Sequence, residues 1–134
     1  MSALSHTEAF NPATGESLGQ IPQNTLEDIQ YAVSRIRKAQ AKWTDLSFSE
    51  RGLHLRKMQA HLIEHGEEYA RIISADNGKT LADAYMTEIS SAVLAFDYYI
   101  KHSARVLRER RVKGSHIFGL FTRNRLQHVP MGVI

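Results

Sequence analysis

The chain has 134 residues and a formal net charge of +3, which leaves room for one domain with a modest core. It contains no cysteine, so disulfides, thiolate catalysis and thiolate metal sites are excluded for these residues. No apolar run approaches the roughly 18 residues of a membrane span, and the N-terminus lacks the basic start and apolar centre of a secretory signal. We therefore expect a cytoplasmic protein with no membrane partner.

The first 24 residues indicate a short β hairpin. Residues 11–15 are a turn signal between two segments able to form strands, 8–10 and 17–21. Residues 25–114 are predicted to form the helical part of a single domain that spans 1–134. We predict four helices there, at about 25–43, 47–65, 67–77 and 80–108.

Capping pairs mark three of the helix starts, because a Ser or Thr cap three residues before an acidic residue satisfies free backbone N–H groups. These pairs are Thr25 with Asp28, Ser47 with Glu50, and Thr80 with Asp83. Gly78 marks the end of the third helix, since glycine tolerates the left-handed backbone of a helix C-cap. The junction 77–80 therefore stops one helix and starts the next.

The fourth helix is amphipathic and has a broad apolar face. The apolar residues that share this face at 100° per residue are Leu81, Tyr85, Ile89, Ala92, Phe96, Tyr99, Ile100, Val106 and Leu107. Glu88 falls within the same face, where a carboxylate needs a donor or a counter-ion. We expect the structure to give Glu88 a specific polar partner.

The C-terminal segment, residues 115–134, changes to β-forming residues. Strands are predicted at 116–121 and 125–129, joined by 122–124. Because no other sheet is evident in these residues, this β hairpin is a candidate pairing surface for another chain; the alternative is a hairpin folded back on the helices. The side chains that we expect at the oligomerisation surface are Ile117, Phe118, Leu120, Phe121, Leu126 and Val129. The fold class is thus mainly α, bracketed by two β hairpins.

Three short motifs suggest metal, phosphate or nucleic-acid binding, and each also has a simpler structural explanation. His61, Glu64 and His65 match H-x-x-E-H, a metallopeptidase signature, and two His four residues apart can share a metal adventitiously. However, no compelling further ligand follows, and a solvated flank of the helix explains these residues. The sequence at 77–80 resembles the end of a phosphate-binding loop, but it lacks the upstream glycine and follows a helix rather than a strand. The basic cluster at 105–113 could engage nucleic acid, yet it lacks interleaved aromatic residues, and basic side chains also complement a helix C-terminus. We predict no catalytic, cofactor-binding or metal-binding residues.

The order and spacing of several short motifs resemble the N-terminal quarter of the NAD(P)-dependent aldehyde dehydrogenase superfamily. The resemblance covers about residues 10–134. The segments that carry it are Asn11-Pro12-Ala13-Thr14-Gly15-Glu16, Ala32-Val33, Trp43, Leu46-Ser47, Glu50-Arg51, Ser74-Ala75-Asp76-Asn77-Gly78-Lys79-Thr80, Ala84, Glu88, Tyr98-Tyr99 and Pro130-Met131-Gly132-Val133-Ile134.

The resemblance implies a mainly α fragment of an α/β enzyme that oxidises an aldehyde to a carboxylic acid with NAD or NADP. In that family the nucleotide-binding glycines, the general-base Glu and the nucleophilic Cys lie downstream of the segment matched here. We therefore expect no cofactor in this chain, no catalysis by it, and a role in packing and oligomerisation. The resemblance also implies that the C-terminal strands join the sheet of a neighbouring subunit, and some members hold a monovalent cation near the position of Glu88.

Two other functions remain open at this stage. One is a helical interaction module that self-associates without catalysis, because an apolar helix face lacking its usual cover would drive association. A homo-oligomer could then form through the C-terminal β segment or through the exposed helix face. The other is a basic nucleic-acid-binding module, which salt-sensitive binding to DNA or RNA would identify; we expect no nucleic-acid partner.

Overall fold

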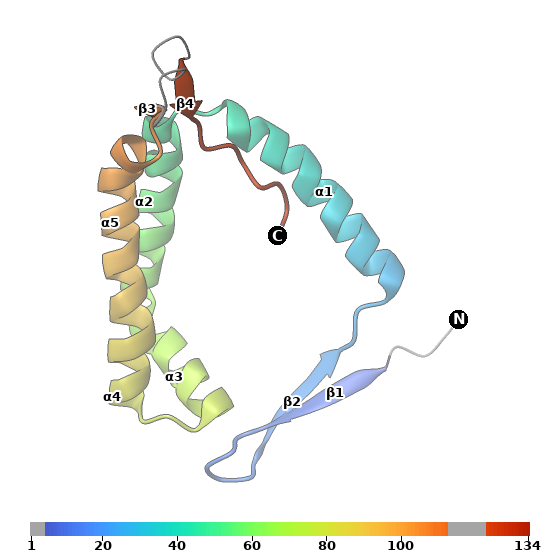
Figure 1. The fold of residues 1–134 in the computed structure, drawn as a ribbon. Helices are drawn as coiled ribbons and strands as arrows, with labels where there is room; N and C mark the ends of the chain where they lie inside the picture. Colours follow the sequence, from blue (N-terminus) through green and yellow to red (C-terminus); the bar gives the residue numbers. More distant parts are fainter. Residues whose placement is uncertain (1–4, 113–122) are drawn as a thin grey trace.

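The computed structural model describes residues 5–112 and 123–134. Helices dominate, with one antiparallel strand pair before them and another after them (Figure 1). In chain order the elements are β1 (His6–Phe10), β2 (Ser17–Pro22), α1 (Leu26–Asp45), α2 (Phe48–Glu64), α3 (Gly66–Asn77), α4 (Leu81–Asp83), η1 (Ala84–Ser90), α5 (Ser91–Val106), β3 (Arg110–Val112) and β4 (Asn124–Leu126). Within the described ranges, no helix is long and apolar enough to cross a membrane.

The N-terminal hairpin forms around the predicted turn. The side-chain oxygen of Asn11 accepts hydrogen bonds from the backbone N–H groups of Ala13 (2.9 Å) and Thr14 (3.3 Å). Gly15 adopts a φ of 75°, a left-handed conformation that favours glycine. The turn thereby sets the antiparallel register in which Glu8 lies opposite Gln20.

The predicted capping pairs determine where the helices start. Thr25 and Ser47 each accept a hydrogen bond from the backbone N–H three residues on, and Asp28 and Glu50 accept from the cap in return. The hydroxyl and the backbone N–H of the cap residue lower the pKa of each carboxyl. These reciprocal bonds satisfy the backbone donors that a helix start leaves free.

The fourth predicted helix is continuous but not α-helical throughout. Its first turn, α4, passes into the π-helical segment η1 before α5 begins. A π-helical segment bonds each residue to the fifth residue along instead of the fourth. It therefore shifts the faces of the helix relative to the 100° spacing used in the sequence analysis.

The core of the described residues is small and lies where α3 packs on η1. The buried hydrophobic residues are Ala70, Ala84 and Ile89, and Leu62, Tyr69 and Ile73 pack around them. The approach is close at Gly66, where a Cβ would lie 3.1 Å from Cγ2 of Ile89. Next to this contact, α2 packs along α5.

Helix α1 stands apart from this helical group, and the molecule is open in shape (Figure 1). The accessible surface is 11341 Å². A compact monomer of 15.2 kDa would expose about 7,100 Å². The chain therefore leaves roughly 4,000 Å² more surface uncovered than a compact fold of the same mass.

The C-terminal strand pair confirms the predicted hairpin and shows that its pairing begins earlier in the chain, within the basic segment. β3 pairs with β4 so that Arg110 lies opposite Leu126. β3 thus starts in the basic segment, only a few residues after the end of α5 at Val106, and β4 begins at Asn124 rather than at 125. The first predicted strand, 116–121, lies entirely outside the described residues.

Candidate functional site

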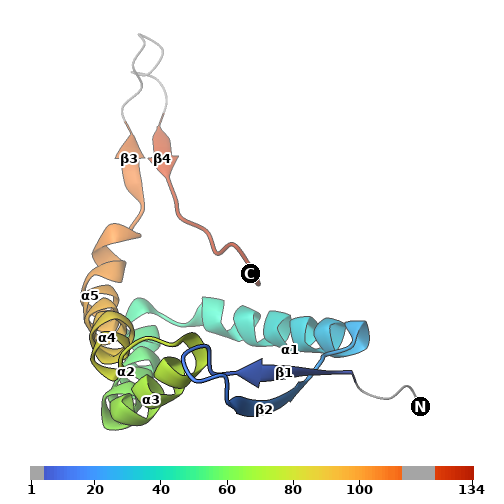
Figure 2. The ribbon, with the colours of Figure 1, turned by 90° about the horizontal axis from the view of Figure 1, so that it is seen from below.

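The strand pair β3–β4 is the first candidate site, because it offers edges for another chain. Figure 2 shows the two strands projecting away from the helices. In the part of the chain that the structure describes, they pair only with each other. Every residue of both strands is exposed. Unpaired strand edges of this kind can accept a further strand.

The predicted oligomerisation residues are only partly covered by the structure. Ile117, Phe118, Leu120 and Phe121 lie outside the described residues. Leu126 belongs to β4 and is 43% exposed, and Val129 follows the strand and is 71% exposed. Both described side chains are therefore available for contact.

Basic residues accompany the strands but do not form an uninterrupted cationic surface. Arg110 and Arg111 lie in β3, and Arg125 lies in β4. The Nη1 atom of Arg125 is 2.8 Å from Oε1 of Glu109, so part of the positive charge is compensated within the chain. The expectation of no nucleic-acid partner stays a prediction.

The second candidate site is the apolar surface of α1 and α5. On α1 the large apolar side chains remain exposed, including Leu26, Ile29 and Ile36. On α5, Tyr99 and Val106 belong to the predicted apolar face and are also exposed. These faces have the amphipathic pattern of helices that pack on a partner. Within the described residues, α2 covers only part of the α5 face, and the side chains named here remain exposed.

Glu88 has the specific polar partner that the sequence predicts. It lies in η1 and forms an ion pair with Nζ of Lys79, with both side chains half-exposed. The Lys79 ammonium lowers the pKa of the Glu88 carboxyl, by hydrogen bonding first and by its charge second. Because that favours the ionised carboxylate, the pair stabilises the folded chain at neutral pH, and this stabilisation is lost as the pH falls through the folded-state pKa.

The helix junction holds Lys79 in place for this contact. The side-chain oxygen of Asn77 accepts from the backbone N–H of Lys79 at 2.9 Å. The hydroxyl of Ser74 donates to the backbone oxygen of Lys79 at 2.7 Å. Gly78, with a φ of 77°, makes the left-handed turn between them. The junction therefore both ends α3 and positions the counter-ion of Glu88.

We predict that replacing Lys79 by methionine raises the pKa of Glu88 toward its ordinary value, because the ammonium is the main cause of the lowering. The measurement is an NMR titration of the Glu88 side-chain carboxyl in both proteins. Asp83→Asn is the control, because it alters a nearby carboxylate and leaves the Lys79 ammonium in place. An unchanged titration of Glu88 in Lys79→Met would contradict the assigned cause.

A shallow cavity of about 650 Å³ lies between the end of α1, the start of α2 and the tail after β4. The Arg51 guanidinium lies against two aromatic rings there, 6.0 Å from the ring centre of Trp43 and 5.3 Å from that of Phe48. Nη2 of Arg51 donates to the backbone oxygen of Thr44 at 2.9 Å. This arrangement fixes the connection between α1 and α2.

The described residues do not fit a nicotinamide dinucleotide. Such a cofactor is held where a parallel strand turns through glycines into a helix. Both described sheets are antiparallel strand pairs, and Gly78 follows a helix rather than a strand.

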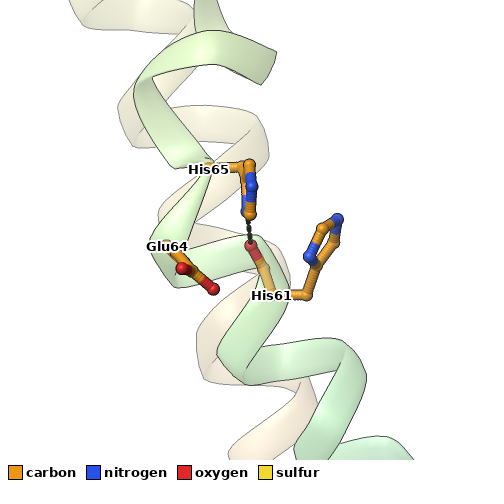
Figure 3. A group of neighbouring side chains, drawn as sticks. All are labelled: His61, Glu64 and His65. Carbon is orange, nitrogen blue, oxygen red and sulfur yellow. Dashed lines mark hydrogen bonds between the residues drawn. The ribbon is translucent and has the colours of Figure 1, made fainter.

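The H-x-x-E-H residues lie together at the end of α2. His61 and Glu64 are exposed and His65 is half-buried, and one ligand atom from each lies within 4.8 Å of the others. Figure 3 shows the three side chains gathered around the last turn of the helix. His54, about two turns before His61 on α2, does not join the cluster. It lies against Trp43, with ring centres 5.8 Å apart.

The profile of the aldehyde dehydrogenase family matches residues 1–134. An aldehyde dehydrogenase-like protein of Saccharomyces cerevisiae is 34% identical over 125 residues, which are 92% of this chain and 19% of that protein. Malonate-semialdehyde dehydrogenase 2 of Oceanobacillus iheyensis is 41% identical over 78 residues, covering 58% of this chain and 16% of that protein. The chain therefore spans about a fifth of the length of these curated relatives.

Solved structures give the same comparison in three dimensions. Succinate-semialdehyde dehydrogenase from Burkholderia pseudomallei superposes with a TM-score of 0.73 and 27% identity, over 84% of this chain and 23% of that one. The NAD+ complex of an aldehyde dehydrogenase from Bacillus cereus superposes with a TM-score of 0.73 and 29% identity, over 83% of this chain and 23% of that one.

Proposed function

Because this chain belongs to the aldehyde dehydrogenase family, we propose that it forms the N-terminal helical layer of an enzyme that oxidises an aldehyde to a carboxylic acid with NAD or NADP. Several of the relatives are named as semialdehyde dehydrogenases. Those names and the NAD+ complex of a structural relative support this reaction class for the whole enzyme. The role of the present residues within it is packing and assembly.

The uncovered apolar surface carries this proposal. The described residues bury only three hydrophobic side chains, two of which are alanines. The apolar face of α1 and the part of the α5 face that α2 does not cover stay open to solvent, although their pattern is that of helices packed on a larger body. A layer of this kind is stabilised mainly by contacts to surfaces that these residues do not provide.

We further propose that β3 and β4 take part in assembly. Their edges are free in the described chain, and Leu126 and Val129 are exposed beside them. A strand of a second subunit could continue this sheet through backbone hydrogen bonds. The homo-oligomer would then use the C-terminal β segment, while the helix faces pack on the cofactor-binding part of the enzyme.

The chemistry of the reaction lies beyond these residues. Aldehyde oxidation in this family needs a cysteine thiolate to add to the aldehyde and a nicotinamide to accept the hydride. The chain has no cysteine, and its described sheets do not form a dinucleotide site. It can contribute positioning and stability to such an enzyme but not the reacting groups.

We predict that the purified 134-residue chain produces no reduced nicotinamide from an aldehyde and NAD+ or NADP+. The reason is the missing nucleophile, which no other side chain here replaces. The measurement is the absorbance of the reduced nicotinamide over time, with a semialdehyde and a simple aliphatic aldehyde as substrates. Reproducible turnover that stops when the aldehyde is withheld would refute the proposal.

A second candidate function is a helical module that self-associates without any catalysis. The same exposed apolar faces favour it. The two functions can be distinguished by adding a second polypeptide, the part of an aldehyde dehydrogenase relative that lies downstream of the matched segment. The enzyme-layer role predicts binding to that polypeptide in preference to self-association, and the module role predicts self-association in its presence.

A further inference from the structure

The cluster at the end of α2 has the composition and spacing of a metal site. Two histidines four residues apart on a helix present their rings on the same side. In this chain the rings of His61 and His65 lie 4.2 Å apart between centres. Glu64 adds a carboxylate, and one ligand atom from each of the three lies within 4.8 Å of the others.

Each imidazole already has one nitrogen engaged by a neighbouring group. Nδ1 of His65 is 3.0 Å from the backbone oxygen of His61. A carbonyl oxygen can only accept, so this nitrogen carries the proton and Nε2 of His65 keeps its lone pair. Figure 3 marks this bond with a dashed line. Such a bond is the usual means by which a protein fixes the tautomer of a histidine that binds metal.

His61 is held in a comparable way from the next helix. Its Nε2 lies 2.9 Å from the hydroxyl oxygen of Tyr69 in α3. When Nε2 donates its proton to that oxygen, Nδ1 has the free lone pair. In the described part of the chain, Glu64 makes no hydrogen bond or ion pair, so its carboxylate is available. The cluster therefore offers two imidazole lone pairs and one carboxylate.

We propose that His61, Glu64 and His65 bind one divalent transition-metal ion of the zinc class. Two imidazoles and a carboxylate suit this class of ion, and three protein ligands leave one tetrahedral position for water. Zinc bonds of about 2.0–2.2 Å place tetrahedral ligands about 3.4 Å apart. The present separations of up to 4.8 Å close to that value by rotations of side chains that are exposed or half-buried.

The bound ion would clamp the bend between α2 and α3. His61 and Glu64 belong to the last turns of α2, and His65 is the single residue that separates α2 from α3. Tyr69 connects the site to α3 through its bond to His61. The sequence alone favoured a solvated flank for these residues. The structure adds the carbonyl contact that sets the tautomer of His65 and the Tyr69 hydroxyl that can hold Nε2 of His61.

The test uses the untagged full chain and Zn²⁺, measured by isothermal titration calorimetry with thermal unfolding followed by circular dichroism. We expect one Zn²⁺ per chain and a higher melting temperature in its presence, since the ion binds only the folded arrangement. H65Q removes a ligand and should weaken binding by more than about tenfold. Y69F removes only the hydroxyl that orients His61 and should weaken it by about tenfold.

H54Q is the matched control, because His54 is exposed on the same helix and lies outside the cluster. It should bind Zn²⁺ like the native chain. As a measurement that needs no variant, NMR of the native chain should show Zn²⁺ shifting the ring resonances of His61 and His65 but not those of His54. Equal Zn²⁺ affinity in the native chain, H65Q and Y69F, or ring shifts spread over all histidines, would overturn the proposal.

Discussion

Replacing Ile89 by alanine should lower the free energy of unfolding by about 2–5 kcal/mol, the usual cost of truncating a buried isoleucine. Ile89 is only 5% exposed and is the one large side chain in the buried core of the described residues. It fills the contact between η1 and α3, beside Ala70, Ala84 and the close approach of Gly66. Since whole domains are stable by about 5–15 kcal/mol, this loss should be readily seen in urea unfolding followed by circular dichroism.

Met86→Ala is the matched control for this experiment. Met86 belongs to the same π-helical segment, loses a side chain of similar size, and is 65% exposed. Its truncation should change the free energy of unfolding by no more than about 0.5 kcal/mol. Equal losses in the two variants would show that the contact between η1 and α3 is not the core of the folded chain.

The helix boundaries were predictable because they depend on local chemistry. A capping residue and its acidic partner lie three positions apart in the sequence, so the starts at Thr25, Ser47 and Thr80 could be read directly. The left-handed stop at Gly78 follows from a property of glycine alone. The structure confirms all of these positions.

The packing was less predictable, because it depends on contacts between elements. The amphipathic pattern predicts an α-helical period throughout the fourth helix, and the π-helical segment η1 interrupts that period. The 100° spacing identifies the apolar face but not the small part of it that is buried. Ile89 is buried, whereas Tyr99 and Val106 on the same predicted face remain exposed.

The candidate sites show the same division. A polar partner for Glu88 was predictable from its place in an apolar face, but Lys79 was not identified, because the two residues face each other across a helix junction rather than at a helical spacing. The C-terminal hairpin was predicted from β propensity, which places a strand at 116–121. That segment lies outside the described residues. The structure adds an earlier strand, β3, which starts at Arg110 in a basic segment with little such propensity. Pairing with β4 fixes that strand, and pairing is not a local property.

The purified chain should form dimers or larger species, with a mass at least twice its 15.2 kDa in light scattering. The roughly 4,000 Å² of excess surface, compared with a compact monomer, includes the apolar faces of α1 and α5. Exposed apolar side chains grouped on helix faces associate with whatever apolar surface is available. In a solution of the chain alone, the available apolar surface belongs to a second copy of the chain. A clean monomer at high concentration would contradict this prediction.

Two pairs of substitutions distinguish the possible routes of association. Ile29→Lys with Ile36→Lys charges the exposed face of α1, a helix that has no buried residue and should stay folded. Val112→Lys with Leu126→Lys charges the strand pair instead, as natural proteins do to protect an exposed sheet edge. If the helix variant alone becomes monomeric, uncovered helix faces drive association, as expected for a layer that lacks its partner. If the strand variant alone becomes monomeric, the β segment is the assembly surface, and the proposed continuation of the sheet gains direct support.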